Sequence, residues 1–209
     1  MRVLPQGKQR PRPIERNGMK ELTMTFATTY KQDVVDAIAH IDIEKVELAT
    51  SWLREARDAR RHIFACGNGG SASTASHFVC DVVKGASYQR QKRFRIMALT
   101  DSLATMTAYS NDVHFDCIFV EQLKNFADRG DVLIAISGSG NSPNVVHAAE
   151  YARSVGCKTI GLTGRDGGKL AQAVELNIHV PVQHMGRIED AHLIICHMMA
   201  YELMEPDVS

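Results

Sequence analysis

Five short runs of mostly apolar residues, rich in branched side chains, recur along the chain after residue 61. Within each run the apolar residues are nearly continuous, which is typical of strands covered on both faces in a parallel sheet. Segments of helix length separate the runs. This alternation predicts an α/β fold, a three-layer αβα sandwich on a doubly wound, mainly five-stranded parallel sheet. The runs are HIFAC (62–66), RIMAL (95–99), DVLIAIS (131–137), KTIGLT (158–163) and ELNIHV (175–180).

The segments around the runs predict the helices. Apolar residues recur at steps of three and four from about residue 26 to residue 61, so we expect two packed helices there, broken near Asp42. A final helix is expected at 187–202. The helices between strands are expected at 71–84, 103–127, 143–155 and 168–173.

Residues 1–25 differ from the rest of the chain in composition. They are basic and contain prolines, but they lack the apolar core of a secretory signal. We expect a mobile tail here. An alternative is that the protein begins at Met19 or Met24. With 209 residues, 44% of them hydrophobic, the chain suits a single domain at 26–209 that includes the N-terminal helices.

Charge, hydropathy and cysteine usage exclude several functional classes. Lysine plus arginine and aspartate plus glutamate both number 24, so no overall basic field favours direct binding of nucleic acid. No apolar run approaches the ~18 residues of a membrane span, so no membrane partner is expected. The five cysteines form no CxxC pair, which favours reduced core thiols in a cytoplasmic protein over disulfides or a thiolate catalyst. They are Cys66, Cys80, Cys117, Cys157 and Cys196.

Two loops rich in glycine, serine and asparagine follow predicted strands and precede predicted helices. They read CGNGGSAS (66–73) and SGSGNSPN (137–144). Ligands bind at the carboxyl ends of strands in a doubly wound sheet. Glycines let the backbone approach an anion, hydroxyls donate hydrogen bonds, and free N–H groups at the helix start face the same place. The two loops together therefore predict a phosphate site, although each alone is also compatible with an ordinary tight turn.

The type of phosphate ligand follows from what the loops lack. Neither loop has the Gly-Lys-Ser/Thr of a Walker A motif, and neither matches GxGxxG with its downstream acid. A small molecule carrying one phosphate is therefore expected, in preference to a nucleotide.

Three segments resemble the signature segments of the phosphoheptose isomerases, members of the sugar isomerase (SIS) domain family. They are CGNGGSASTASHF (66–78), SGSGNSPN and the residues that follow it (137–170), and RIEDAHLIICH (187–197). The resemblance implies a flavodoxin-like SIS domain, a phosphorylated sugar as ligand, and a homotetramer with active sites built between chains. It also implies a set of substrate-binding residues. These are Asn68, Gly69, Gly70, Ser71, Asp101, Ser137, Gly138, Ser139, Ser142 and Glu189.

An aldose–ketose isomerase needs a base and an acid to move a proton between neighbouring carbons. His77 and Asp81 are four residues apart and share a helix face, and Glu189 and His197 share a broad face of the last helix. In the phosphoheptose isomerases the corresponding residues are His and Glu on the first helix and Gln and His on the last. The resemblance therefore implies that Asp81 and His197 are catalytic.

Two of these four positions depart from the family pattern. Asp81 stands where the family has Glu, and Glu189 stands where it has Gln. Aspartate is one methylene shorter than glutamate, and a misplacement of about 1 Å can lower a rate ~100-fold.

The same four residues are a candidate metal site, because some relatives hold zinc with these positions. His77, Asp81, Glu189 and His197 offer two nitrogen and two oxygen donors, a set that suits zinc. An alternative is that Glu189 pairs with Arg187 or with a neighbouring subunit. No organic cofactor is expected. For His192, in an otherwise apolar segment, a packing role and a site role both stay open.

The favoured function is a ketose–aldose isomerase of phosphorylated sugars that converts sedoheptulose 7-phosphate to D-glycero-D-manno-heptose 7-phosphate through an enediol. One alternative is a non-catalytic binding protein, because some SIS relatives associate with the bacterial replication initiator protein. Those relatives lack the histidine that corresponds to His197, and its presence here favours catalysis. Another alternative is an isomerase or sensor for a different phosphosugar, since phosphate loops do not read hydroxyl stereochemistry.

Overall fold

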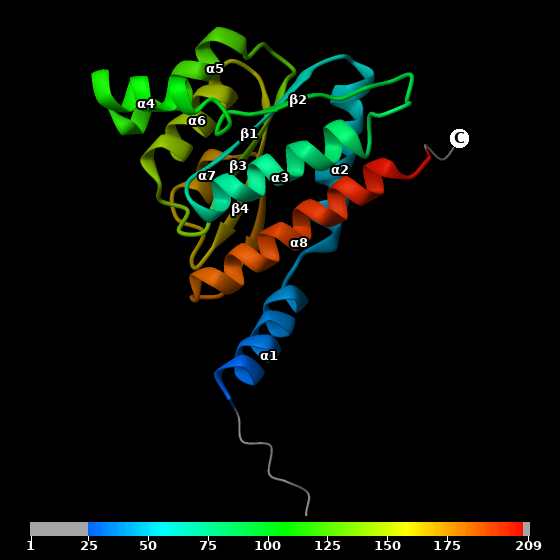
Figure 1. Ribbon diagram of the computed structural model, residues 1–209, viewed down its shortest axis with the longest axis vertical. Helices are drawn as coiled ribbons and strands as arrows, with labels where there is room; N and C mark the ends of the chain where they lie inside the picture. The colour runs from blue at the N-terminus through cyan, green and yellow to red at the C-terminus, as the bar shows by residue number, and fades with distance from the viewer. Residues whose placement is uncertain (1–24, 207–209) are drawn as a thin grey trace, which may run out of the picture.

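The computed structural model describes residues 25–206, and the predicted N-terminal tail lies outside these residues except for Thr25. Five parallel strands form one sheet in the order β2-β1-β3-β4-β5. This confirms the predicted α/β fold with a doubly wound parallel sheet (Figure 1). The strands are β1 (His62–Gly67), β2 (Arg95–Ala98), β3 (Val132–Ser137), β4 (Lys158–Gly164) and β5 (Leu176–Val180).

Helices cover both faces of the sheet, which explains why the strand sequences are continuously apolar. Along β3, Val132, Ile134 and Ile136 pack into one core cluster, and Leu133 and Ala135 pack into the other. The first cluster includes residues of α1 (Phe26–Ala39), α2 (Ile43–Asp58), α3 (Gly70–Lys84) and α8 (Met185–Met204). The second cluster includes residues of α5 (Val120–Phe126), α6 (Pro143–Ser154) and α7 (Leu170–Ala173).

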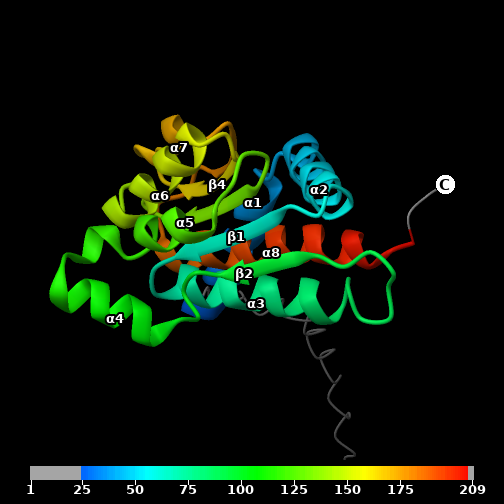
Figure 2. The same cartoon turned by 90° about the horizontal axis from the view of Figure 1, so that it is seen from above.

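Helices α3 and α8 run alongside each other on the first face of the sheet (Figure 2). Helix α1 packs against α8, where the Tyr30 hydroxyl donates to Asp190 at 2.7 Å. The expected break between α1 and α2 is confirmed, because Asp42 caps α2 and its carboxylate accepts from the Lys45 backbone at 3.3 Å. Helix α8 is two residues longer at each end than the predicted 187–202.

The single helix predicted at 103–127 is wrong. The segment forms α4 (Leu103–Asp112), a 3₁₀ turn (Phe115–Cys117) and α5. His114 interrupts it with an extended backbone, φ −165° and ψ 145°, and its ring accepts from the Asp116 N–H at 3.1 Å. This side-chain hydrogen bond replaces the helical one and ends the continuous helix.

The cysteines form no disulfide, and three of them lie in the core as predicted. Burial raises the pKa of the Cys66, Cys157 and Cys196 thiols to about 12, which keeps them protonated. Cys80 is exposed, so its assignment to the core is wrong. Among residues 25–206, no helix combines the length and apolar character needed to cross a bilayer.

Candidate active site

The two phosphate-type loops lie next to each other because β1 and β3 are neighbours in the sheet. Each loop leads into a helix, α3 after the first and α6 after the second. The side-chain amides of Asn68 and Asn144 exchange two hydrogen bonds of 2.9 Å and tie the loops together. Asn144 is 1% exposed, and its Oδ1 also accepts from the Val145 N–H at 3.0 Å. The sequence prediction missed Asn144; its position directly after Pro143 at a helix start was the available signal.

The loops and the start of α8 enclose a cavity of about 250 Å³, here called the serine cavity. Nine of the ten predicted substrate-binding residues line it. The Ser137 hydroxyl donates to that of Ser142 at 3.3 Å, so the two side chains converge within the second loop. The cavity is lined by Asn68, Gly69, Gly70, Ser71, Ile136, Ser137, Gly138, Ser139, Ser142, Met185 and Glu189.

The second loop owes its shape to a glycine. Gly140 has φ +66°, a conformation that favours glycine, and a Cβ there would lie 2.0 Å from the Gly167 carbonyl oxygen. The loop therefore packs backbone to backbone against the turn after β4.

The tenth predicted substrate residue, Asp101, lies apart from the serine cavity. It follows β2 at the carboxyl edge of the sheet, as expected from sequence. Its carboxylate accepts a hydrogen bond of 2.5 Å from the Ser76 hydroxyl of α3. Within one chain, this carboxylate therefore does not reach the serine cavity.

Two histidines and an aspartate meet where α3 and α8 run together. The Nε2 atoms of His77 and His197 are 3.0 Å apart. The Asp81 Oδ2 atom lies 3.3 Å from His77 Nε2 and 3.8 Å from His197 Nε2. This oxygen is buried, and no hydrogen bond from a described residue satisfies it. The three ligand atoms lie within 4.8 Å of one another, close enough to share one metal ion.

The donor chemistry of this cluster suits a divalent cation. Two imidazole nitrogens and one carboxylate oxygen are common zinc donors, and catalytic zinc sites have three protein ligands and one open position. A cation would also satisfy the buried Asp81 oxygen, which accepts no hydrogen bond from residues 25–206.

Glu189, the fourth predicted ligand, is not part of this cluster among the described residues. Its carboxylate lies over Gly70 in the first turn of α3, so close that a Cβ on Gly70 would be 2.4 Å from Glu189 Oε1. The alternative pairing with Arg187 is absent from residues 25–206, because Arg187 forms its ion pair with Asp33 of α1. Glu189 therefore faces the cavity instead of a charged partner on its own helix.

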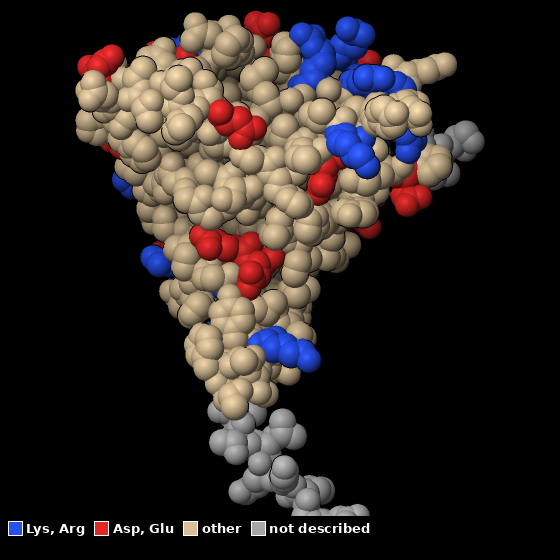
Figure 3. Space-filling model, viewed as in Figure 1, with Lys and Arg blue, Asp and Glu red and all other residues tan. Residues whose placement is uncertain are grey.

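A second cavity, of about 270 Å³, adjoins the serine cavity and is here called the histidine cavity. Gly70 and Glu189 line both cavities, and His77 lines the second. Figure 3 shows acidic side chains gathered over the N-terminal half of α8, the part that carries Glu189 and Asp190. The histidine cavity is lined by Gly70, Ser73, Thr74, His77, Glu189, Asp190 and Leu193.

Comparison with known proteins agrees with this architecture. The SIS domain family model matches residues 28–164. Phosphoheptose isomerases from Aliarcobacter butzleri and Syntrophotalea carbinolica are 38% and 37% identical to the chain, over 82% and 90% of its length and 93% and 96% of theirs. The chain belongs to the phosphoheptose isomerase family of SIS-domain proteins.

Solved structures of this family superpose on the chain. Phosphoheptose isomerase GmhA from Neisseria gonorrhoeae matches with a TM-score of 0.78 and 32% identity, covering 85% of this chain and 96% of that one. A phosphoheptose isomerase from Francisella tularensis matches with a TM-score of 0.81 and 26% identity, covering 86% and 97%. The SIS assignment made from the three sequence segments is confirmed.

In this SIS domain, His192 is a core residue. It is 1% exposed and lies beside the backbone of Thr163, and it lines neither the serine cavity nor the histidine cavity. Burial lowers the pKa of its imidazole to about 4, and this effect outweighs the opposing influence of the nearby Thr163 backbone. Neither ring nitrogen forms a hydrogen bond with a described residue. His192 is therefore neutral at pH 7, which supports the packing role.

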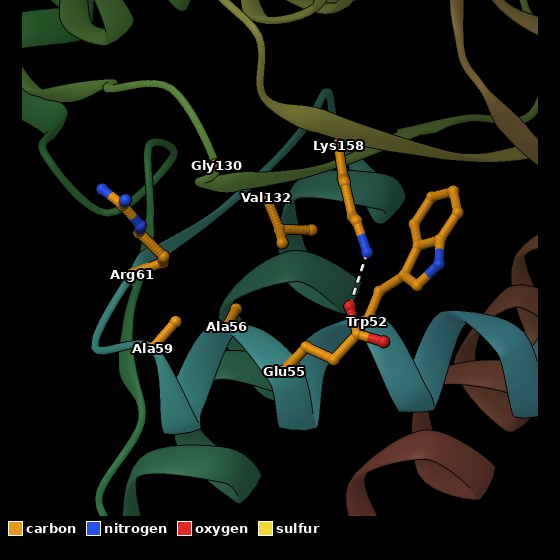
Figure 4. Close-up of a pocket in the computed structure, with 8 residues that line it drawn as sticks. All are labelled: Trp52, Glu55, Ala56, Ala59, Arg61, Gly130, Val132 and Lys158. Carbon is orange, nitrogen blue, oxygen red and sulfur yellow. Dashed lines mark hydrogen bonds and ion pairs between the residues drawn. The ribbon is translucent and has the colours of Figure 1, made fainter.

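Another hollow lies at the opposite end of the sheet, between α2 and the amino ends of the strands (Figure 4). Lys158 lies 4.9 Å from the centroid of the Trp52 ring and pairs with Glu55 at 2.6 Å. Its ammonium group thus already has an acidic partner and an aromatic neighbour. None of the predicted site residues lines this hollow.

Proposed function

We propose that the chain isomerises sedoheptulose 7-phosphate and D-glycero-D-manno-heptose 7-phosphate through an enediol. The observation that carries this proposal is the junction of the serine cavity with the histidine cavity at Gly70 and Glu189. A sugar phosphate with its phosphate among the serines would extend its carbon chain past these two residues toward His77. The identity of 37–38% to proteins named phosphoheptose isomerase supports the same reaction.

The phosphate would be held by hydroxyls and backbone N–H groups. Ser71, Ser137, Ser139 and Ser142 line one cavity, and α3 begins at its wall. The dipole of a helix start attracts a phosphate without requiring a lysine or arginine. In α3 the Ser71 and Ala72 N–H groups already donate to the Asn68 and Gly69 carbonyl oxygens, so the dipole and the serine hydroxyls would contribute most.

The chemical step needs a carboxylate and an imidazole near the first two carbons of the sugar. The predicted catalytic pair is Asp81 and His197, whose closest atoms lie 3.8 Å apart. The arrangement of His197 beside His77 supports an enzyme over the binding-protein alternative, which would not need this cluster.

We also propose that His77, Asp81 and His197 hold a divalent cation, with zinc the best match to the donors. When bound, the cation would polarise the sugar carbonyl as a Lewis acid. The buried Asp81 oxygen without a hydrogen bond supports this assignment. Glu189 would not be needed as a ligand, because three protein donors suffice in catalytic zinc sites.

A homotetramer is proposed from the family resemblance and is supported by exposed apolar side chains. Phe26 on α1 is 75% exposed, Leu103 on α4 is 71% exposed, and Val113 just beyond α4 is 65% exposed. Association would bury part of this surface. The free cysteines are consistent with a cytoplasmic location, which is likewise a proposal.

The test is to incubate the purified protein with sedoheptulose 7-phosphate and follow the aldose product by NMR. One sample is treated with chelator and one is supplied with zinc. We expect aldose to form at least in the presence of zinc. If no aldose forms under either condition, the proposed function is wrong.

A further inference from the structure

We propose that Glu189, and not Asp81, is the base that moves the proton between C1 and C2 of the sugar. The inference rests on the proposed isomerase function and assigns a catalytic residue within it. It differs from the pair implied by the family resemblance, because the carboxylate that faces the substrate path in this chain lies on α8.

The first argument is position. Glu189 lines both the serine cavity and the histidine cavity, whereas Asp81 lines neither. A sugar phosphate that spans the two cavities must pass the Glu189 carboxylate. Because a general base has to approach the carbon-bound proton within contact distance, position alone favours Glu189.

The second argument is availability. Among residues 25–206, no hydrogen bond or ion pair is formed by the Glu189 carboxylate, although its neighbours on α8 are both engaged. Arg187 pairs with Asp33, and Asp190 accepts from Tyr30. An unengaged carboxylate that borders a cavity can accept a proton without first breaking an interaction.

Asp81 is placed differently. Its Oδ2 atom is buried between the two imidazoles, 3.3 Å from His77 and 3.8 Å from His197. Its shorter side chain holds the carboxylate back against the histidines. A carboxylate in this position is suited to orient the imidazoles or to bind a cation.

The step balances as follows. The Glu189 carboxylate takes a proton from C1 of the ketose. The electron pair of that C–H bond forms the C1–C2 double bond of the enediol. At the same time O2 gains a proton from an imidazole. The Glu189 carboxyl group then returns its proton to C2, and the O1 proton passes to the imidazole as the C1 carbonyl forms. In the cation-free site His77, which lines the same cavity, is this imidazole. With a cation held by its ring, a water molecule would exchange the same two protons instead. No oxidant or reductant is consumed.

The experiment compares Glu189→Gln with Glu202→Gln, a matched carboxylate-to-amide change on the same helix, where Glu202 pairs with Arg54. For each protein we would measure kcat and KM with sedoheptulose 7-phosphate, its binding by calorimetry, and exchange of the C1 proton in D2O. We expect Glu189→Gln to lose about 100-fold or more in kcat and to lose C1 exchange, with binding within about threefold of wild type. Glu202→Gln should match wild type.

Two outcomes would overturn the assignment of Glu189. One is a Glu189→Gln protein that keeps its kcat and C1 exchange within about threefold of wild type. The other is a loss explained entirely by weaker binding, which would make Glu189 a binding residue. In both cases an active wild type leaves the isomerase function intact. An inactive wild type would instead reject the proposed function itself.

Discussion

Adding one methyl group at Gly70 should separate folding from catalysis. A Cβ at this position would lie 2.4 Å from Glu189 Oε1, 2.6 Å from Cδ and 2.8 Å from Oε2. Ordinary contact begins near 3.4 Å. The Glu189 carboxylate must therefore retreat by about 1 Å in Gly70→Ala, a displacement that can cost ~100-fold in rate when the moved group is catalytic.

The same substitution should not destabilise the fold. Gly70 is the first residue of α3 and does not have a positive φ. Alanine is at least as compatible with a helical backbone as glycine, and the opposing atoms belong to the end of a flexible side chain. We expect an unchanged or slightly raised melting temperature together with a kcat about 100-fold lower.

The assay pairs thermal unfolding with kinetics on sedoheptulose 7-phosphate, for Gly70→Ala alone and in the Glu189→Gln background. Because both changes act on the same carboxylate, the second should add little to the first, and their effects on the activation free energy should be far from additive. A Gly70→Ala protein that folds and keeps wild-type kcat would refute the reasoning. So would fully additive losses.

Four further outcomes follow from the structure. Gly140→Ala should lower the free energy of unfolding, measured in urea, by about 2 kcal/mol or more. Gly140 has φ +66°, and the new Cβ would lie 2.0 Å from the Gly167 carbonyl oxygen, a backbone atom that cannot shift without distorting the turn. The pKa of His192 is about 4 in the folded state and ~6.5 in the unfolded state, so its contribution to the free energy of unfolding should be complete above pH 6.5 and fall by roughly 2–3 kcal/mol toward pH 4. His192→Leu should make the free energy of unfolding, measured by urea titration, less dependent on pH in this range. Ser142→Ala should raise KM about tenfold with an unchanged melting temperature, as measured by steady-state kinetics and thermal unfolding. Zinc should raise the melting temperature of the wild type, and His77→Ala should abolish this shift and lower the bound zinc measured by elemental analysis.

The fold was predictable because buried parallel strands leave continuous apolar runs in the sequence. All six residues of β3 are buried, and for that reason the strand was easy to recognise as an apolar run in the sequence. The interruption of the 103–127 segment left no such trace. Helix α4 has no buried residue, and neither glycine nor proline marks its end. The break depends on one local hydrogen bond from Asp116 to the His114 ring, which competes with the helix.

Only the contacts between residues a few positions apart in the sequence could be predicted for the site. His77 and Asp81 are four residues apart, one turn of α3, so their approach followed from sequence. Glu189 and His197 are eight residues apart, about 12 Å along the axis of α8. Whether both reach one point depends on how α8 lies against α3, and in the structure only His197 joins the cluster. The contact between Asn144 and Asn68 was also out of reach of local spacing, because the two residues lie 76 positions apart.

A carboxylate beside a phosphate site repels the ligand, so the position of Glu189 needs a compensating charge. The structure provides one in the N-terminus of α3, because the carboxylate lies over Gly70, the first residue of that helix. The partial positive charge of a helix start stabilises a nearby anion. The same helix end also borders the serine cavity, where the phosphate would lie. One helix terminus would thus attract the phosphate and at the same time offset the charge of the proposed base, which would allow a glutamate to stand where the family resemblance implies a neutral glutamine.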